Sequence, residues 1–327
     1  MNIRLTDRHD VPADASGDVA DILAGLRAQQ KSLPSRLFYD EAGCVLFGKI
    51  TELPEYYVTR AEMALLAADA DDIVSGSPAD SVLVEYGASD ESKAAVLLRA
   101  GAGHLTAYVP IDIAGPALAL LQDRMRHTHP TLDVEPVEAD FTSRVMLPAV
   151  AADRPRLGFF PGSTIGNFEP EMVLRFLRQA RADLSRGAAG TEGPRFVIGT
   201  DLRKDPAVLL PAYDDAAGVT AAFNRNILRH VNRIADADFD PDLFAHRAAW
   251  NEQEGRIEMH LVSRLPQGVR VAGHAIGFAA GESIHTESSY KHTREGFLAL
   301  AARAGWVADG FWTDPASRFG MHRLTPA

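Results

Sequence analysis

The sequence predicts an α/β protein that is built on a doubly wound, mainly parallel sheet and carries an inserted α+β region. Two observations predict this class. Between about residues 81 and 200, short apolar runs of the strand type alternate with amphipathic helical stretches, which is typical of a parallel sheet covered by helices on both faces. After residue 200 this alternation stops, and runs with a two-residue hydrophobic period indicate an antiparallel sheet with one buried face.

The expected elements follow one another along the chain. Apolar side chains at helical spacing predict helices over about 19–26 and 61–75. Apolar runs then predict strands over residues 82–86, 105–113, 132–137, 157–160 and 196–199. The helices between these strands are expected over about 94–98, 116–126 and 170–184. The remaining expected elements are a helical stretch over about 206–233, strands over 256–262 and 269–271, a helix over 293–304, and strands near Trp306 and Phe319.

This order of elements predicts a domain inserted between strands of one sheet. We expect residues 61–199 and 292–327 to form the domain of the parallel sheet, and residues 1–60 and 200–291 to form a second domain. A length of 327 residues agrees with two domains of about 150 residues each or with one elaborated α/β unit, and the order of elements favours the first.

Composition excludes several classes of protein. The formal net charge of -11 repels phosphate backbones and anionic lipids, so a nucleic-acid or membrane partner is not expected. Cys44 is the only cysteine, which excludes an intrachain disulfide and a zinc site made of several cysteines. The chain starts without an apolar signal segment, and no apolar run reaches about 18 residues. We therefore expect a cytoplasmic protein, and no histidine spacing predicts a metal site.

Ligand-type residues follow successive strands of the expected parallel sheet. In such sheets, ligands bind outside the carboxyl ends of the strands. Gly87 follows the first strand and permits a tight turn. Asp112 ends the second strand, and its spacing from Gly87 along the sequence is typical of a carboxylate that binds a ribose hydroxyl. Asp140 and Phe141 follow the third strand. The Asp140 carboxylate can accept from an adenine amine, and the Phe141 ring can cover the adenine. Either acid alone would more often cap a helix, but acids at successive strand ends favour adenosine.

The first turn fits an adenosine cofactor that has no pyrophosphate. Neither G-x-G-x-x-G nor G-x-x-x-x-G-K-[ST] occurs, and residues 87–93 carry two acids where phosphate needs positive potential. Lys93 can meet a carboxylate, and the two acids can meet an ammonium group. S-adenosylmethionine combines adenosine with an amino-acid tail, so it is the cofactor that the sequence predicts.

Further stretches together resemble a known enzyme family. They read ITELPEYYVTR at 50–60, FPGSTIGNF at 160–168, AYDDAAGVTAAFNRN at 212–226, IHTESSYK at 284–291 and WTDP at 312–315. In this order and spacing they resemble the L-histidine Nα-methyltransferases of ergothioneine biosynthesis, over about residues 33–320. One departure is Ser89, which stands where family members commonly carry the second glycine of Glu-Leu-Gly-Ser-Gly.

The resemblance implies a Rossmann-like class I methyltransferase domain, a substrate-capping domain, and trimethylation of the histidine α-amino group to hercynine. Separately, we expect the protein to be a monomer. The positions that match the family's cofactor site are Tyr39, Gly87, Lys93, Asp112, Asp140 and Phe141. The positions that match its histidine site are Tyr56, Gly162, Asn167, Tyr213, Met259, Glu287 and Ser289. Asn167 and Tyr213 would hold the carboxylate, while Asn167 and Tyr39 would orient the amine. Glu287, Ser289 and Tyr56 would read the imidazole, against which Met259 would pack.

Alternatives remain at this point. Taken singly, a tyrosine or methionine here is usually a packing residue, and a glutamate such as Glu287 is usually a solvated surface acid. The same fold could methylate the amine of another small amino acid, such as tryptophan or tyrosine. A nicotinamide-dependent dehydrogenase is disfavoured by the missing glycine motif, and a catalytically silent binding protein by the intact set of site positions.

Overall fold

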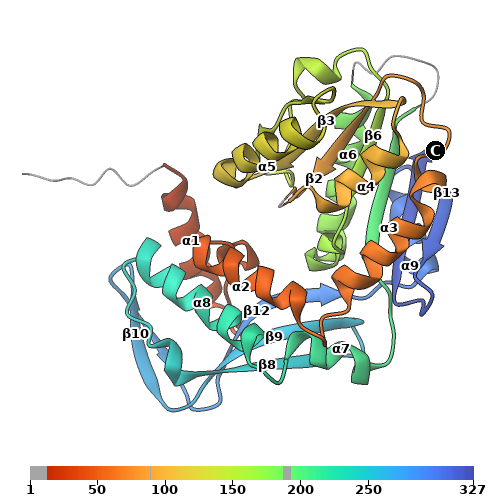
Figure 1. The fold of residues 1–327 in the computed structure, drawn as a ribbon. Coiled ribbons are helices and arrows are strands. Elements are labelled where there is room, and N and C mark those ends of the chain that lie inside the picture. The colour runs from red at the N-terminus through yellow and green to blue at the C-terminus, as the bar shows by residue number, and fades with distance from the viewer. Residues whose placement is uncertain (1–12, 89, 187–192) are drawn as a thin grey trace, which may run out of the picture. The chain divides into compact units, whose positions relative to one another are not determined.

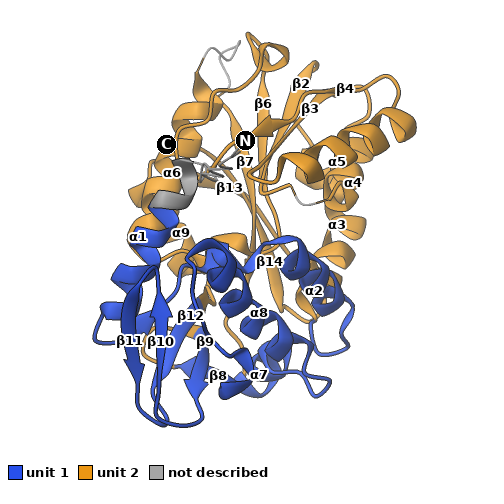
Figure 2. Cartoon of the chain, turned by 90° about the vertical axis from the view of Figure 1, so that its left-hand side faces the viewer, with its two compact units in different colours: residues 1–56, 206–251, 257–287 blue, residues 57–205, 252–256, 288–327 orange. Residues whose placement is uncertain are grey.

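The computed structural model describes residues 13–88, 90–186 and 193–327 (Figure 1). Ser89, the predicted departure from the family pattern, lies outside the described residues. The chain divides into two compact units (Figure 2). Unit 1 comprises residues 1–56, 206–251 and 257–287, and unit 2 comprises residues 57–205, 252–256 and 288–327. For comparison, the expected boundaries fall after residues 60, 199 and 291.

Unit 2 contains the predicted doubly wound sheet. Over the described residues its strands lie in the order β13-β14-β7-β6-β2-β3-β4, and β5 also pairs with β3. The strands are β2 (Ser81–Tyr86), β3 (Leu105–Asp112), β4 (Asp133–Val134), β5 (Val137–Glu138), β6 (Arg156–Phe160), β7 (Arg195–Asp201), β13 (Trp306–Thr313) and β14 (Phe319–Pro326). The strands from β2 to β7 pair in parallel, whereas β14 runs antiparallel to both β7 and β13. This confirms the predicted Rossmann-like class.

Helices cover both faces of this sheet, α6 and α9 on one face and α3, α4 and α5 on the other (Figure 2). They are α3 (Val58–Val74), α4 (Ser92–Ala100), α5 (Gly115–Thr128), α6 (Pro170–Ser185) and α9 (Arg294–Arg303). All residues of β2 and β6 are buried, as expected for strands with helices on both sides. Tyr86, Phe160, Phe176, Phe196 and Trp306 are the large side chains of the core beneath α6 and α9.

Unit 1 is built around a sheet with the order β1-β12-β9-β8 and a separate hairpin, β10-β11. Its strands are β1 (Lys31–Ser32), β8 (Phe244–Asn251), β9 (Arg256–Ser263), β10 (Gln267–Val271), β11 (His274–Phe278) and β12 (Ser283–Tyr290). Its helices are α1 (Ala13–Arg27), α2 (Glu41–Glu52), α7 (Pro206–Tyr213) and α8 (Val219–Ile234). Alternate residues Ile257, Met259 and Leu261 of β9 are buried, which is the period-two pattern that the sequence shows.

Two expected elements are divided in the structure. The strand expected over 132–137 is two short strands, because Pro136 has no N–H for the ladder and interrupts the pairing with β3. The helical stretch expected over 206–233 is two helices, α7 and α8. Gly218 adopts a left-handed conformation (φ 75°) between them, and the Asp215 carboxylate accepts hydrogen bonds from the first N–H groups of α8. Within the described residues, no helix has both the length and the apolar character needed to cross a membrane.

Candidate active site

The turns after β2, β3 and β5 lie side by side at the carboxyl edge of the parallel sheet. The backbone N–H of Gly87 donates to the Ile111 carbonyl (2.8 Å), and the N–H of Ala139 donates to the Asp112 carbonyl (2.9 Å). Gly87 has φ 75°, which favours glycine, and a Cβ added there would lie 3.5 Å from the Phe141 ring. The structure therefore brings Gly87, Asp112 and the Asp140–Phe141 turn to one edge of the sheet.

The two strand-end acids cap their own turns, and one of them is largely desolvated. Asp112 accepts a hydrogen bond from the Ala114 N–H (2.8 Å), and Asp140 accepts from the N–H and hydroxyl of Thr142 (2.8 and 2.6 Å). Burial raises the pKa of Asp112 above its usual value, although the backbone N–H groups of Ala114 and Ile113 oppose the shift. Hydroxyl groups that donate to a desolvated carboxylate stabilise its charged form, so Asp112 fits a ribose diol.

Lys93 lies in a buried charge cluster with Glu62, which the sequence analysis missed. The Lys93 ammonium is 2.7 Å from a Glu62 carboxylate oxygen, and Glu62, on α3, is fully buried. Burial alone would lower the pKa of Lys93, but the Glu62 carboxylate raises it above the usual value. Glu62 also accepts from the backbone N–H of Gly162, at 2.8 and 3.0 Å to its two oxygens. Glu62 thus links the predicted cofactor residue Lys93 to the predicted substrate residue Gly162.

A second carboxylate, Glu85 at the end of β2, is buried beside this cluster. Burial raises the pKa of Glu85 to about 8, against the opposing effect of a hydrogen bond from the Tyr108 hydroxyl and of the Lys93 charge. The Glu62 carboxylate already neutralises the Lys93 ammonium. A protonated Glu85 therefore keeps the net charge of these three buried side chains near zero at neutral pH.

The loop after β6, which carries Asn167, approaches the end of β12. Gly162 and Ser163 both have left-handed conformations (φ 77° and 57°), and Asn167 ends the short 3-10 helix Thr164–Asn167. A Cβ at Gly166 would lie only 2.8 Å from the Tyr290 carbonyl, so glycine permits the close approach of loop and strand. The predicted residues Asn167 and Ser289 therefore belong to neighbouring segments of unit 2.

A polar cluster fastens the far end of this loop. The Tyr290 hydroxyl donates to Glu169, the residue before α6 (2.5 Å), and Arg256 donates to both side chains (3.0 Å to Glu169 and 2.5 Å to Tyr290). Burial and the nearby Glu169 carboxylate raise the pKa of Tyr290 to about 12, so the phenol keeps the proton that it donates.

Within unit 1, the predicted tyrosines Tyr39 and Tyr56 share an aromatic cluster. Both rings make edge contacts with Phe47 of α2, with centroids 5.9 and 6.4 Å away, and Tyr39 also contacts Phe223 of α8 (6.0 Å). Tyr56 is buried, whereas Tyr39 is 42% exposed. Phe47 and Phe223 were not recognised from the sequence as part of this group, because an aromatic residue on an amphipathic helix has no mark that separates it from core.

A hydrogen-bonded chain connects the elements that carry Tyr213, Met259 and Glu287. The His246 Nε2 atom lies 2.8 Å from the Tyr213 carbonyl, and its Nδ1 atom lies 2.8 Å from the Asn224 amide. Asn224 in turn accepts from the Thr286 hydroxyl (2.8 Å), which also lies 3.0 Å from the Met259 carbonyl. A carbonyl can only accept, so Nε2 carries the proton of a neutral imidazole, and burial lowers the pKa of His246 in agreement.

The three substrate positions on β9 and β12 are buried. Glu287 is 8% exposed, Met259 2% and Ser289 4%. The interpretation of Glu287 as a solvated surface acid is therefore wrong. A carboxylate at this position can accept a hydrogen bond from a polar ligand group in a largely water-free environment.

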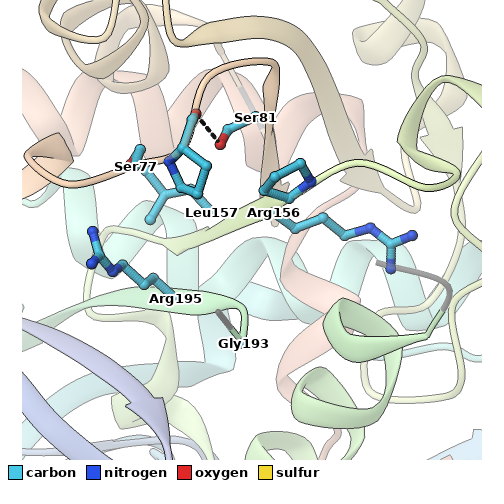
Figure 3. A pocket seen from close by; sticks show the side chains of 8 residues that line it. Ser77, Ser81, Arg156, Leu157, Gly193 and Arg195 are labelled. Carbon is cyan, nitrogen blue, oxygen red and sulfur yellow. Dashed lines mark hydrogen bonds between the residues drawn. The ribbon is translucent and has the colours of Figure 1, made fainter. Parts of the chain in front are cut away.

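A hollow lies at the opposite edge of the parallel sheet (Figure 3). It is lined near the amino ends of β2, β6 and β7 by residues that include Ser81, Arg156 and Arg195. Because parallel sheets bind ligands at their carboxyl ends, we do not assign the reaction to this hollow.

Comparisons with known proteins find similar sequences among S-adenosylmethionine-dependent and other N-methyltransferases. The family described as "Histidine-specific methyltransferase, SAM-dependent" matches residues 18–326. A histidine N-alpha-methyltransferase of Mycolicibacterium smegmatis is 43% identical over 306 residues, covering 92% of each chain. The enzyme of the same name from Mycobacterium tuberculosis is 41% identical over 305 residues, again covering 92% of each chain. An N-methyltransferase of Aspergillus flavus, imqF, is 27% identical over 92% of this chain and 82% of its own.

The family match spans nearly all of the chain and includes every predicted site position. It also includes the strands whose carboxyl ends carry Gly87, Asp112 and Asp140. The chain belongs to the family of histidine-specific, S-adenosylmethionine-dependent methyltransferases.

Proposed function

We propose that this enzyme transfers three methyl groups from S-adenosylmethionine to the α-amino group of L-histidine and forms hercynine, the first step of ergothioneine biosynthesis. The observation that carries the proposal is the 43% identity with a histidine N-alpha-methyltransferase over 92% of both chains. An ergothioneine biosynthesis protein of Neurospora crassa, 28% identical over 90% of this chain and 33% of its own, supports the pathway. We place the enzyme in the cytoplasm as a monomer that acts on a small molecule.

The donor set at the carboxyl edge fits the proposed cofactor. Asp112 would hold the ribose hydroxyls, Asp140 the adenine amine, and Phe141 would cover the ring beside the Gly87 turn. When bound, S-adenosylmethionine supplies an electrophilic methyl group on a sulfonium centre. Lys93 forms an ion pair with Glu62 in the structure. Its ammonium group would therefore contact the Glu62 carboxylate and the cofactor carboxylate at the same time. Tyr39 is the remaining position that matches the family's cofactor site.

The proposed histidine contacts follow from side-chain chemistry. Asn167 and Tyr213 offer donors for the substrate carboxylate, and Gly162 gives space for a close backbone approach. The buried Glu287 would accept from an imidazole N–H, with Ser289 and Tyr56 fixing the ring plane and Met259 packing on it. A hydrogen bond to such a carboxylate contributes most where water is excluded, because few water molecules compete for the acceptor.

Catalysis depends on orientation of the amine. The α-amine titrates above neutrality, so a neutral fraction is present at pH 7 and the protein has to select it rather than deprotonate it. Asn167 and Tyr39 would point its lone pair at the methyl group, and such alignment supplies much of the rate enhancement. Each of the first two transfers leaves an ammonium group that must release a proton before its lone pair is available again, whereas the third leaves a quaternary nitrogen without a lone pair and the reaction stops. Methylation of tryptophan or tyrosine amines is not favoured, since the relatives named for dimethylallyltryptophan are only 24–25% identical.

The product of the reaction tests the proposed function. With limiting histidine and excess cofactor, we expect mass spectrometry to show mono- and dimethylated species giving way to trimethylhistidine. Fragmentation should place every methyl group on the α-nitrogen. An endpoint at one methyl group, or a methyl group on the ring, would contradict the proposal.

Substitution of Asp112 by alanine tests the cofactor site. Loss of the carboxylate should weaken binding of S-adenosylhomocysteine at least tenfold, or about 1.4 kcal/mol, measured by calorimetry. Asp133→Ala is the control, because this residue is exposed on β4, away from the carboxyl edge. Equal affinity in wild type and a folded Asp112→Ala variant would remove Asp112 from the cofactor site.

A further inference from the structure

Lys291, just after β12, is a buried cation held between two groups of unit 2. Its side chain is fully buried, and its ammonium nitrogen is 2.9 Å from an Asp201 carboxylate oxygen. The same nitrogen donates to the Ser289 hydroxyl oxygen at 2.8 Å. Asp201 ends β7 at the carboxyl edge of the sheet and is also fully buried. The Lys291–Asp201 ion pair is thus in direct contact, through Lys291, with Ser289, which we assign to binding of the substrate imidazole.

The Asp201 carboxylate is kept ionised and fixed in place. The Tyr57 hydroxyl lies 2.8 Å from both of its oxygens, and the Lys204 ammonium donates to one of them. The backbone N–H of Asp201 donates to the Ser163 hydroxyl (2.8 Å), which links it to the Asn167 loop. Burial opposes ionisation, but Lys291 and Lys204 lower the pKa of Asp201 below its usual value. Asp201 can therefore hold Lys291 in one orientation.

A buried ion pair of this kind is a poor device for stability. Desolvation of two charges costs several kcal/mol per ion, and apolar side chains of similar volume often do as well. Orientation of a third group is a use for which the pair is better suited. Ser289 is that third group, because it shares the Lys291 ammonium with Asp201.

The polarity of the Ser289 hydroxyl follows from its lysine neighbour. An ammonium group can only donate, so the Ser289 oxygen accepts from Lys291 and its own proton points elsewhere. We infer that Lys291, held by Asp201, is a positioning residue that makes Ser289 a hydrogen-bond donor to the unprotonated ring nitrogen of the substrate histidine. This inference rests on the proposed function.

The strand geometry gives the two ring nitrogens different partners. Glu287 and Ser289 are two residues apart on β12, so their side chains leave the same face of the strand. The Glu287 carboxylate offers acceptor oxygens, and Ser289 oriented by Lys291 donates. A neutral imidazole offers one N–H and one bare nitrogen, and this pair of side chains is complementary to it.

A double-mutant cycle tests the coupling between Lys291 and Ser289. Lys291→Met and Ser289→Ala should each raise KM for histidine about five- to tenfold, the order of one hydrogen bond, with kcat within twofold because the ring and not the amine is affected. The double variant should be no worse than Ser289→Ala, since Lys291 acts through that hydroxyl. Lys31→Met, which breaks an ion pair with Glu282, is the control and should leave KM unchanged.

Three results would overturn the inference. If the two single effects on KM multiply in the double variant, Lys291 does not act through Ser289. An unchanged KM in Lys291→Met would also show that Lys291 does not position Ser289. If Lys291→Met does not fold, the cycle is run with the charge-neutral combination of Lys291→Met and Asp201→Asn, and the same criteria apply. A wild-type enzyme that leaves histidine unmethylated overturns the proposed function together with this inference, whereas additivity in an active enzyme overturns the inference alone.

Discussion

Substitution of Glu62 by alanine should lower the free energy of unfolding by about 3–5 kcal/mol, the usual effect of removing one partner of a buried ion pair. The change leaves the Lys93 ammonium without its carboxylate and removes the acceptor of the Gly162 N–H. Because both groups belong to proposed binding positions, affinity for S-adenosylhomocysteine should fall as well. Chemical denaturation and calorimetry on the same preparation measure the two effects.

Matched variants separate charge from shape at this position. Glu62→Gln keeps an acceptor for Gly162 but no charge for Lys93, so it should be less destabilising than Glu62→Ala. Adding Lys93→Met to Glu62→Gln removes the unpaired cation and should recover stability, while affinity for the cofactor analogue stays low. A free energy of unfolding of Glu62→Ala within about 1 kcal/mol of the wild-type value would instead be the effect of an ordinary substitution. In that case Glu62 does not link the Gly162 loop to Lys93 as we describe.

Combined replacement of Glu287 by alanine and Met259 by valine should lower kcat/KM for histidine by roughly ten- to a few hundredfold. The physical reason is the loss of a buried acceptor for the imidazole N–H, an effect of about 1–3 kcal/mol or more. The same change removes the carboxylate that an indole would meet and enlarges the apolar space. Activity on tryptophan should therefore rise from its wild-type level. Steady-state kinetics on both amino acids measure the exchange.

Glu282→Ala is the control for this experiment. Glu282 precedes β12 by one residue and pairs with Lys31, so its loss removes an acid of the same region that we do not assign to the substrate. Histidine turnover should be unaffected by it. If turnover also survives in the Glu287 and Met259 variant, Glu287 does not bind the ring and the substrate returns to an unidentified small amine.

Local patterns in the sequence determined the sheet and the edge at which ligands bind. Apolar runs of four to eight residues bounded by glycine and helical stretches are a property of neighbouring residues, so β2, β3, β6 and β7 could be predicted one by one. The rule that parallel sheets bind ligands at their carboxyl ends then selected Gly87, Asp112 and Asp140. The division at Pro136 was predictable too, because a missing N–H is a local property, but the apolar residues around it outweighed that signal.

The tertiary structure alone decided which buried charges meet. Glu62 precedes Gly162 by 100 residues, and Asp201 lies between Tyr57, the residue before α3, and Lys291 after β12. The sequence places Lys93 after a glycine turn, whereas the strand expected over 196–199 ends before Asp201, so Asp201 was not recognised. The sequence around Lys93 and around Asp201 does not indicate which residue each of them pairs with. Hydrophobic periodicity reports how a segment faces the core, whereas the choice of partner for a buried ion depends on packing among segments far apart in the chain.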